Sequence, residues 1–218
     1  MFSKLFKWLS RDEKGITGLE TAIILIAFVV VAAVFAYTAL SAGLFATQKS
    51  QEAVFAGLEE ARSSVELRGS VTAIASTTGA SGTIKQVTFV LSNALRGEAI
   101  DFTAPTAISD NTGVAHADSN NRVVISYIDQ YQRVDDLYWT VTKLGKEDGD
   151  DLLENNEKFQ ITIGSSANTT AGGNLIDALT TDLGPNKTFT IEVKPAVGAV
   201  LTIERSTPAY IDTIMDLH

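Results

Sequence analysis

An uninterrupted apolar segment is the feature that most constrains how this chain can fold. From Thr21 to Gln48 the sequence carries 28 consecutive residues without a charged side chain. At about 1.5 Å per residue, a helix of this length spans about 42 Å, more than the ~30 Å hydrocarbon core of a bilayer. Its large aliphatic residues surround the whole helix, which is typical of a membrane span or of the centre of an assembly. A soluble domain has no surface on which to leave such a segment.

A short basic leader, MFSKLFKWLSRDEK, precedes the apolar segment. The positive-inside rule keeps such a segment in the cytoplasm, so the apolar helix points outward. A secretory signal peptide has its small-residue cleavage site after the apolar run, whereas here the candidate junction, Lys14-Gly15 followed by Ile16, comes before it. Cleavage after Gly15 would therefore keep the apolar segment in the mature protein. An uncleaved signal anchor is the alternative.

This order resembles the class III signal peptides of type IV pilins and archaeal flagellins, which a prepilin-type peptidase cuts after Gly. After that cut the chain begins at Ile16, and Glu20 becomes its fifth residue, the position at which type IV pilins carry a glutamate. A carboxylate beside a bilayer-length apolar run is costly unless it is paired or reaches the interface. We expect it to pair with the new α-amino group of its own or a neighbouring chain. Its negative charge would also favour the dipole of the first helical turn.

Small residues recur within the apolar run at intervals of four, a spacing that lets neighbouring helices approach closely. The pairs include Ala32 with Ala36 and Ala39 with Gly43. Burial of each large aliphatic side chain is worth roughly 1.5–3 kcal/mol against water, and lipid or a filament core supplies that term about equally. The sequence therefore permits a transfer between the two, and the resemblance to pilins and archaeal flagellins implies lipid before assembly and neighbouring helices afterwards.

Past Gln48 the pattern becomes amphipathic, in KSQEAVFAGLEEARSSVELRG. Apolar residues from Val54 to Leu67 lie roughly on one face, and Gly69 supplies a helix stop. One helix from Ile16 to about Leu67 would be near 78 Å long. A membrane span followed by a short linker helix is the alternative.

From Ser70 onward the hydrophobic period switches to two. Phe89 lies in one such alternating segment, and the stretches around Ile125, Ile161 and Ile191 repeat the pattern between turn clusters such as STTGASG and GKEDGDD. About eight short strands without a long helix predict an antiparallel β-sandwich. The fold class is thus α+β, organised as a leader over residues 1–15, an assembly helix over 16–68 and a β-sandwich over 69–218.

Composition narrows the possible functions. The net charge of −9 argues against nucleic-acid binding. The chain has no cysteine and only two histidines, His116 and His218, so it offers little for a thiolate or histidine-based catalytic or metal site. We therefore predict no enzymatic activity and no cofactor.

Two kinds of modification or ligand site stand in the predicted β-body. Asn168 and Asn186 each begin an Asn-X-Thr sequon for N-glycosylation, although both can simply be loop or strand residues. The acidic run at Asp148, Asp150 and Asp151 offers oxygen ligands for Ca²⁺ or another hard cation. It does not follow the EF-hand spacing, so a solvated turn is the preferred interpretation.

Along essentially its full length the chain is similar to the archaellins, the subunits of the archaeal motility filament. The similarity rests on the Lys-Gly junction, GLETAIILIAFVVVAAVFAY, LYWTVTKLG and LGPNKTFTIEVKPAVGAVLTIERSTP. It implies that this chain, alone or with other archaellins, forms an extracellular filament with immunoglobulin-like domains on the outside. It also implies frequent glycosylation, and a membrane-embedded machinery that assembles and rotates the filament. An archaeal type IV pilin or surface adhesin is the first alternative. A single-pass membrane protein with an external binding domain is the second.

Overall fold

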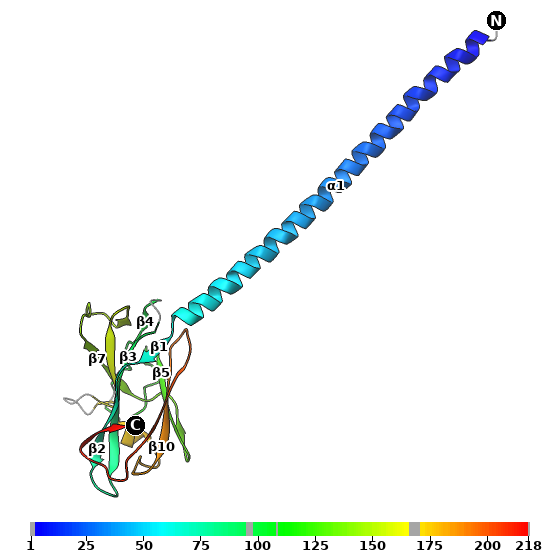
Figure 1. Ribbon diagram of the computed structural model, residues 1–218. Helices are drawn as coiled ribbons and strands as arrows, with labels where there is room; N and C mark the ends of the chain where they lie inside the picture. The colour runs from blue at the N-terminus through cyan, green and yellow to red at the C-terminus, as the bar shows by residue number, and fades with distance from the viewer. Residues whose placement is uncertain (1–2, 95–97, 108, 166–170, 218) are drawn as a thin grey trace. The chain divides into compact units, whose positions relative to one another are not determined.

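The computed structural model describes residues 3–94, 98–107, 109–165 and 171–217 (Figure 1). The chain divides into two compact units, Met1–Phe55 and Ala56–His218. The first is helical, and the second contains the end of the same helix and all the described strands.

Helix α1 runs without interruption from Ser3 to Arg62. It begins before the predicted Lys14-Gly15 junction, and it ends before Leu67, where the sequence predicted its end. The expectation of a helix to Leu67 is wrong, because Val65–Leu67 forms strand β1, which pairs with the end of β3. Val65 and Leu67 are two positions apart, which is the period of a strand. On a helix they would lie about 200° apart. From Ile16 to Arg62 the helix is therefore about 70 Å long.

The predicted stop at Gly69 also has a different role. Gly69 adopts a φ of 84° in the turn between β1 and β2, a left-handed conformation that favours glycine. It turns the chain between two strands and does not end the helix.

The second unit is an antiparallel β-sandwich, as predicted. Its larger sheet has the order β12-β2-β3-β9-β7, with β1 on β3, and the smaller sheet has the order β11-β10-β5-β6. Strands β4 and β8 form a separate pair, and α2 is a single short turn at Leu175–Ala178. The remaining strands are β2 Val71–Thr77, β3 Thr83–Asn93, β4 Ile100–Asp101, β5 Val124–Asp129, β6 Arg133–Val134, β7 Trp139–Leu144, β8 Leu152–Leu153, β9 Lys158–Ile163, β10 Thr188–Lys194, β11 Leu201–Ser206 and β12 Ile214–Leu217.

One hydrophobic core lies between the two sheets. The alternating residues predicted to share a face are buried: Phe89, Ile125, Ile161 and Ile191 all have no exposed surface. Phe102 packs edge-on against Trp139 and Phe159 at 6.1 Å between ring centroids. The sandwich thus buries its hydrophobic core within one chain.

Candidate assembly surface

The first unit has the opposite character, because its large apolar side chains are exposed. Every large apolar residue from Leu19 to Leu58 is 51–73% exposed, and these residues occur all around the helix. Thr17–Leu58 is long and apolar enough to cross a membrane, and none of its most apolar stretch is buried. Burial of each such side chain would be favourable by about 1.5–3 kcal/mol. Lipid or another protein molecule must therefore cover these side chains.

The threonine hydroxyl groups of the apolar run do not prevent burial in an apolar environment. Thr21 donates to the Thr17 carbonyl at 2.7 Å, Thr38 to the Phe35 carbonyl at 2.9 Å and Thr47 to the Leu44 carbonyl at 2.8 Å. A polar group in hydrocarbon is costly only when it lacks a partner, and these three have one in their own helix. Polar contacts resume after the run, where Lys49 and Glu52 form an ion pair at 2.6 Å.

The predicted small residues gather on one side of α1. At 100° per residue, Ala32, Ala36, Ala39 and Gly43 lie within about 60° of one another around the axis. All four are exposed, and a side chain added at Gly43 would meet nothing within 4 Å in this chain. The alternating four- and three-residue spacing continues through Ala46, Ser50 and Ala53. Pairs four residues apart, considered alone, do not show this extension.

The predicted processing site lies within α1. The backbone is helical on both sides of the Gly15–Ile16 bond, so the leader and the apolar run form one continuous helix in the uncleaved chain. Glu20 is exposed, one residue before the charge-free run begins. It lies one helical turn after Ile16, so an amino group created at Ile16 would be within reach of its carboxylate.

One of the two sequons can be placed. Asn186 is exposed in the turn before β10 and adopts a φ of 52°, a conformation that asparagine tolerates in turns. Its neighbour Lys187 lies with Nζ 4.4 Å from the centroid of the Tyr131 ring. Asn168 lies outside the described residues.

The acidic run forms a hydrogen-bonded turn. The Asp148 carboxylate accepts a bond from the Asp150 backbone N–H at 3.2 Å, and the Asp150 carboxylate accepts one from the Leu152 N–H at 2.9 Å. Asp151 pairs with Lys143 at 3.0 Å. Among the described residues, no three acidic or histidine side chains gather as metal ligands would. These contacts fit the solvated turn that the sequence favours.

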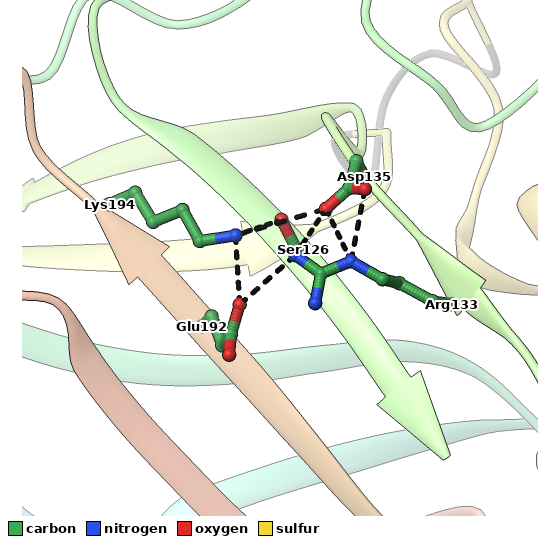
Figure 2. A network of polar contacts seen from close by, with 5 residues as sticks. All are labelled: Ser126, Arg133, Asp135, Glu192 and Lys194. Atoms are coloured by element: carbon green, nitrogen blue, oxygen red, sulfur yellow. Dashed lines mark hydrogen bonds and ion pairs between the residues drawn. The ribbon is translucent and has the colours of Figure 1, made fainter. Parts of the chain in front are cut away.

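A charged cluster that the sequence did not reveal covers the outer face of the smaller sheet (Figure 2). Arg133 binds Asp135 at 2.9 Å and Glu192 at 3.4 Å, and Lys194 binds Glu192 at 2.8 Å. Lys194 also donates to the buried hydroxyl of Ser126 at 3.2 Å. Hydrogen bonds from the Arg133 guanidinium lower the pKa of Asp135 to about 2. With two charges of each sign, the cluster ties the short strand β6 to β10.

Comparison with known proteins identifies the family. Residues 15–205 match the family model of the archaeal-type flagellins. A protein described as probable flagellin 1 of Archaeoglobus fulgidus is 41% identical over 95% of this chain and 96% of its own length. The probable flagellin 1 of Aeropyrum pernix is 35% identical over 93% of this chain and 96% of its own length.

A solved structure shares both the helix and the sandwich. It is described as the archaeal flagellum of Methanospirillum hungatei and superposes with a TM-score of 0.59 at 26% identity, over 92% of this chain and 98% of that one. Together with the family model, these matches decide between a flagellin and the pilin or adhesin alternative. An exposed apolar helix on an antiparallel β-sandwich, matched over nearly its whole length by flagellins, places this chain in the archaeal-type flagellin family.

Proposed function

We propose that this chain is made as a membrane-inserted precursor, is cut after Gly15, and polymerises through α1. As an archaeal-type flagellin it is a structural subunit of the filament of the archaeal flagellum and serves motility; the family is one of filament subunits and not of enzymes. Copies of the chain, together with any related archaellins, form a core of α1 helices, and the sandwich domains form the outer shell.

The observation that carries this proposal is the exposed apolar surface of α1. The sandwich buries its own core, whereas every large apolar side chain from Leu19 to Leu58 is more than half exposed. Only other molecules can cover that surface. Lipid covers it in the precursor and neighbouring helices cover it in the filament, with close approach along the face of Ala32, Ala36, Ala39 and Gly43.

Transfer from lipid to filament needs help, because lipid and helix neighbours supply similar burial energies. We assign that work to a membrane-embedded assembly and motor machinery and the cut itself to a prepilin-type peptidase. Support for the cut comes from the family match, which begins at Gly15, the last residue of the leader, and leaves out residues 1–14. Glu20 then pairs with the α-amino group of Ile16 in its own or a neighbouring chain.

The sandwich carries the remaining proposed features. Asn186 is an accessible glycan acceptor, because it is exposed in a turn, and Asn168 is the second candidate by its sequon. We assign no cofactor. The internal hydrogen bonds of the turn at Asp148, Asp150 and Asp151 favour a structural turn over a Ca²⁺ site.

Processing is tested by the mass and N-terminal residue of the protein from cells. The chain should begin at Ile16 and contain one tryptophan, Trp139, because Trp8 lies in the leader. Gly15→Phe should leave full-length precursor in the membrane and no filaments, whereas Gly18→Ala, also a glycine near the junction, should be cut normally. A wild-type chain that begins at Met1 in filaments would disprove the cut.

The pairing of Glu20 is tested by Glu20→Gln, which keeps the size of the side chain and removes its charge. We expect normal cleavage but at least a severalfold loss of filaments, because the α-amino group then stays unpaired in an apolar environment. Normal assembly of this variant would refute the pairing.

A further inference from the structure

The turn between β10 and β11 has an unusual surface for a hairpin tip. Ala196, Val197, Ala199 and Val200 are all exposed, Val197 by 45% and Val200 by 50%. Turns between strands are normally built from polar residues, glycine and proline, as in the GKEDGDD turn of this chain. The apolar tip, residues 196–200, therefore gains nothing from facing water.

Glycine fixes the apolar tip against the segment in which α1 ends. Gly198 has a φ of 109°, and a Cβ added there would overlap the carbonyl oxygen of Ser63, the residue directly after the helix. Any other residue would both strain the backbone and collide with that oxygen. The exposed valines are thereby held beside the end of the assembly helix, within the sandwich unit.

The base of the hairpin is fixed as well. Val193 pairs with Leu201 in the ladder that closes the turn. The next residue, Lys194, is bonded to Glu192 and to Ser126 in the charged cluster (Figure 2). A tip held at its base and at its centre has little conformational freedom to lose on binding, which favours its use as a contact surface.

We propose that the apolar tip is a second subunit contact in the filament and packs on the α1 helix of a neighbouring copy. The proposal rests on the proposed function, in which α1 is the assembly surface. The tip lies directly beside the end of α1 and so continues that surface onto the sandwich. The matching chemistry on a second copy is apolar, and exposed apolar side chains of α1 such as Phe55 and Leu58 provide it.

Lipid is a poorer occupant for this surface. Segments that lie on membranes are rich in lysine, arginine and tryptophan, and residues 195–200 contain none of these. Lys194, the nearest basic residue along the chain, is engaged with Glu192, and Arg122, which lines the same pocket as Val197, is paired with Asp101. Residues 69–218 carry ten basic and nineteen acidic residues, so the domain as a whole is repelled by anionic headgroups.

The test uses the full chain produced in cells that assemble filaments. The double variant Val197→Lys/Val200→Lys should reduce the sedimentable filament subunit about tenfold at an unchanged level of membrane precursor, because two charges would be buried at the contact. Val197→Leu/Val200→Leu, which keeps the surface apolar, should assemble as wild type does. Ile214→Lys, a charge at an apolar residue of β12 that is 67% exposed, is the matched control and should also assemble normally.

Gly198→Ala gives a second, independent variant. It should also reduce assembly, since the added methyl group displaces the tip from Ser63. Resistance of the membrane precursor to an endoprotease that cuts after glutamate, which gains no new site in any of these variants, reports whether each variant is folded. Wild-type filaments in the same preparation test the proposed function separately. Normal filaments from the lysine variant would overturn the contact. A loss of membrane precursor with normal assembly of the remainder would also overturn it, in favour of lipid.

Discussion

The helix and the sandwich contain similar apolar residues and use them in opposite ways. In α1, Phe35 is 70% exposed and nothing in the chain covers it. In the sandwich, Phe159 has no exposed surface and packs on Phe102 at 6.1 Å. Hydrogen bonding does not separate the two regions, since both helix and sheet satisfy most of their backbone groups internally.

The difference shows which part of the fold depends on other molecules. The sandwich has its own core and draws its stability from contacts within one chain. The helix has a satisfied backbone but an unsatisfied surface, so its environment must come from lipid or from other subunits. Substitutions in the two regions should therefore change different measurements, one the unfolding of a chain and the other the dissociation of a filament.

Phe159→Ala should have the largest effect on the chain itself. Removing a fully buried aromatic ring from a well-packed core costs about 3–5 kcal/mol of unfolding free energy. The processed full chain in detergent can be unfolded with urea, and fluorescence of Trp139 reports the sandwich alone, because this tryptophan is buried in the same core.

Tyr210→Ala is the matched control for that measurement. Tyr210 is 57% exposed, and exposed substitutions usually change stability by less than about 0.5 kcal/mol. A loss as small for Phe159→Ala as for Tyr210→Ala would show that the core is not the source of the sandwich's stability.

Phe35→Ala should have a smaller effect, and on the filament instead. The urea transition of the sandwich should not move, because Phe35 is exposed and belongs to the other compact unit. Filament stability should fall by about 1.5–3 kcal/mol per subunit, the transfer energy of one large side chain, provided the ring is buried between helices. Thermal dissociation of purified filaments measures the loss. A shift in the urea transition reported by Trp139 would instead show that the helix and the sandwich are not stabilised independently.

Much of this architecture follows from simple periodicity. An apolar run without a charge predicts α1, because no alternative conformation hides its backbone and its side chains at once. Alternation predicts the long strands, since Phe89 and Ile161 must face one core. The short strands were beyond reach: β1 and β4 have three and two residues, too few for a period to show. Their pairing is decided by tertiary contacts, as in β1, which pairs with the end of β3 beyond the residues that pair with β2.

Only part of the candidate assembly surface could be predicted from the sequence. The small-residue face of α1 and the position of Glu20 follow from spacing along one helix, a local property. The charged cluster does not, because Ser126, Arg133 and Lys194 come from three strands whose neighbours depend on the sheet order. The contact of Gly198 with Ser63 likewise joins residues 135 positions apart in the sequence.

Asp135→Asn should have the smallest effect. The Asp135 side chain is 58% exposed, and surface ion pairs are screened by water, so we expect a loss of at most about 1 kcal/mol at pH 7. The pKa of Asp135 is lowered to about 2, against about 3.9 for an unperturbed aspartate. Its contribution to stability is therefore present above about pH 4 and is lost as the pH falls toward 2.

The difference in unfolding free energy between wild type and Asp135→Asn should accordingly shrink from pH 7 through pH 4 to pH 2. Urea transitions recorded at these three pH values, which bracket the two pKa values, measure it. Asp212→Asn, at an exposed carboxylate outside the cluster, is the matched control and should change little at any of the three. Filament dissociation should follow the same small trend only if the cluster supports the apolar tip through Lys194. A large effect on filaments with none on unfolding would place the charged cluster itself at a subunit contact, and would make the outer face of the sandwich a part of the assembly surface.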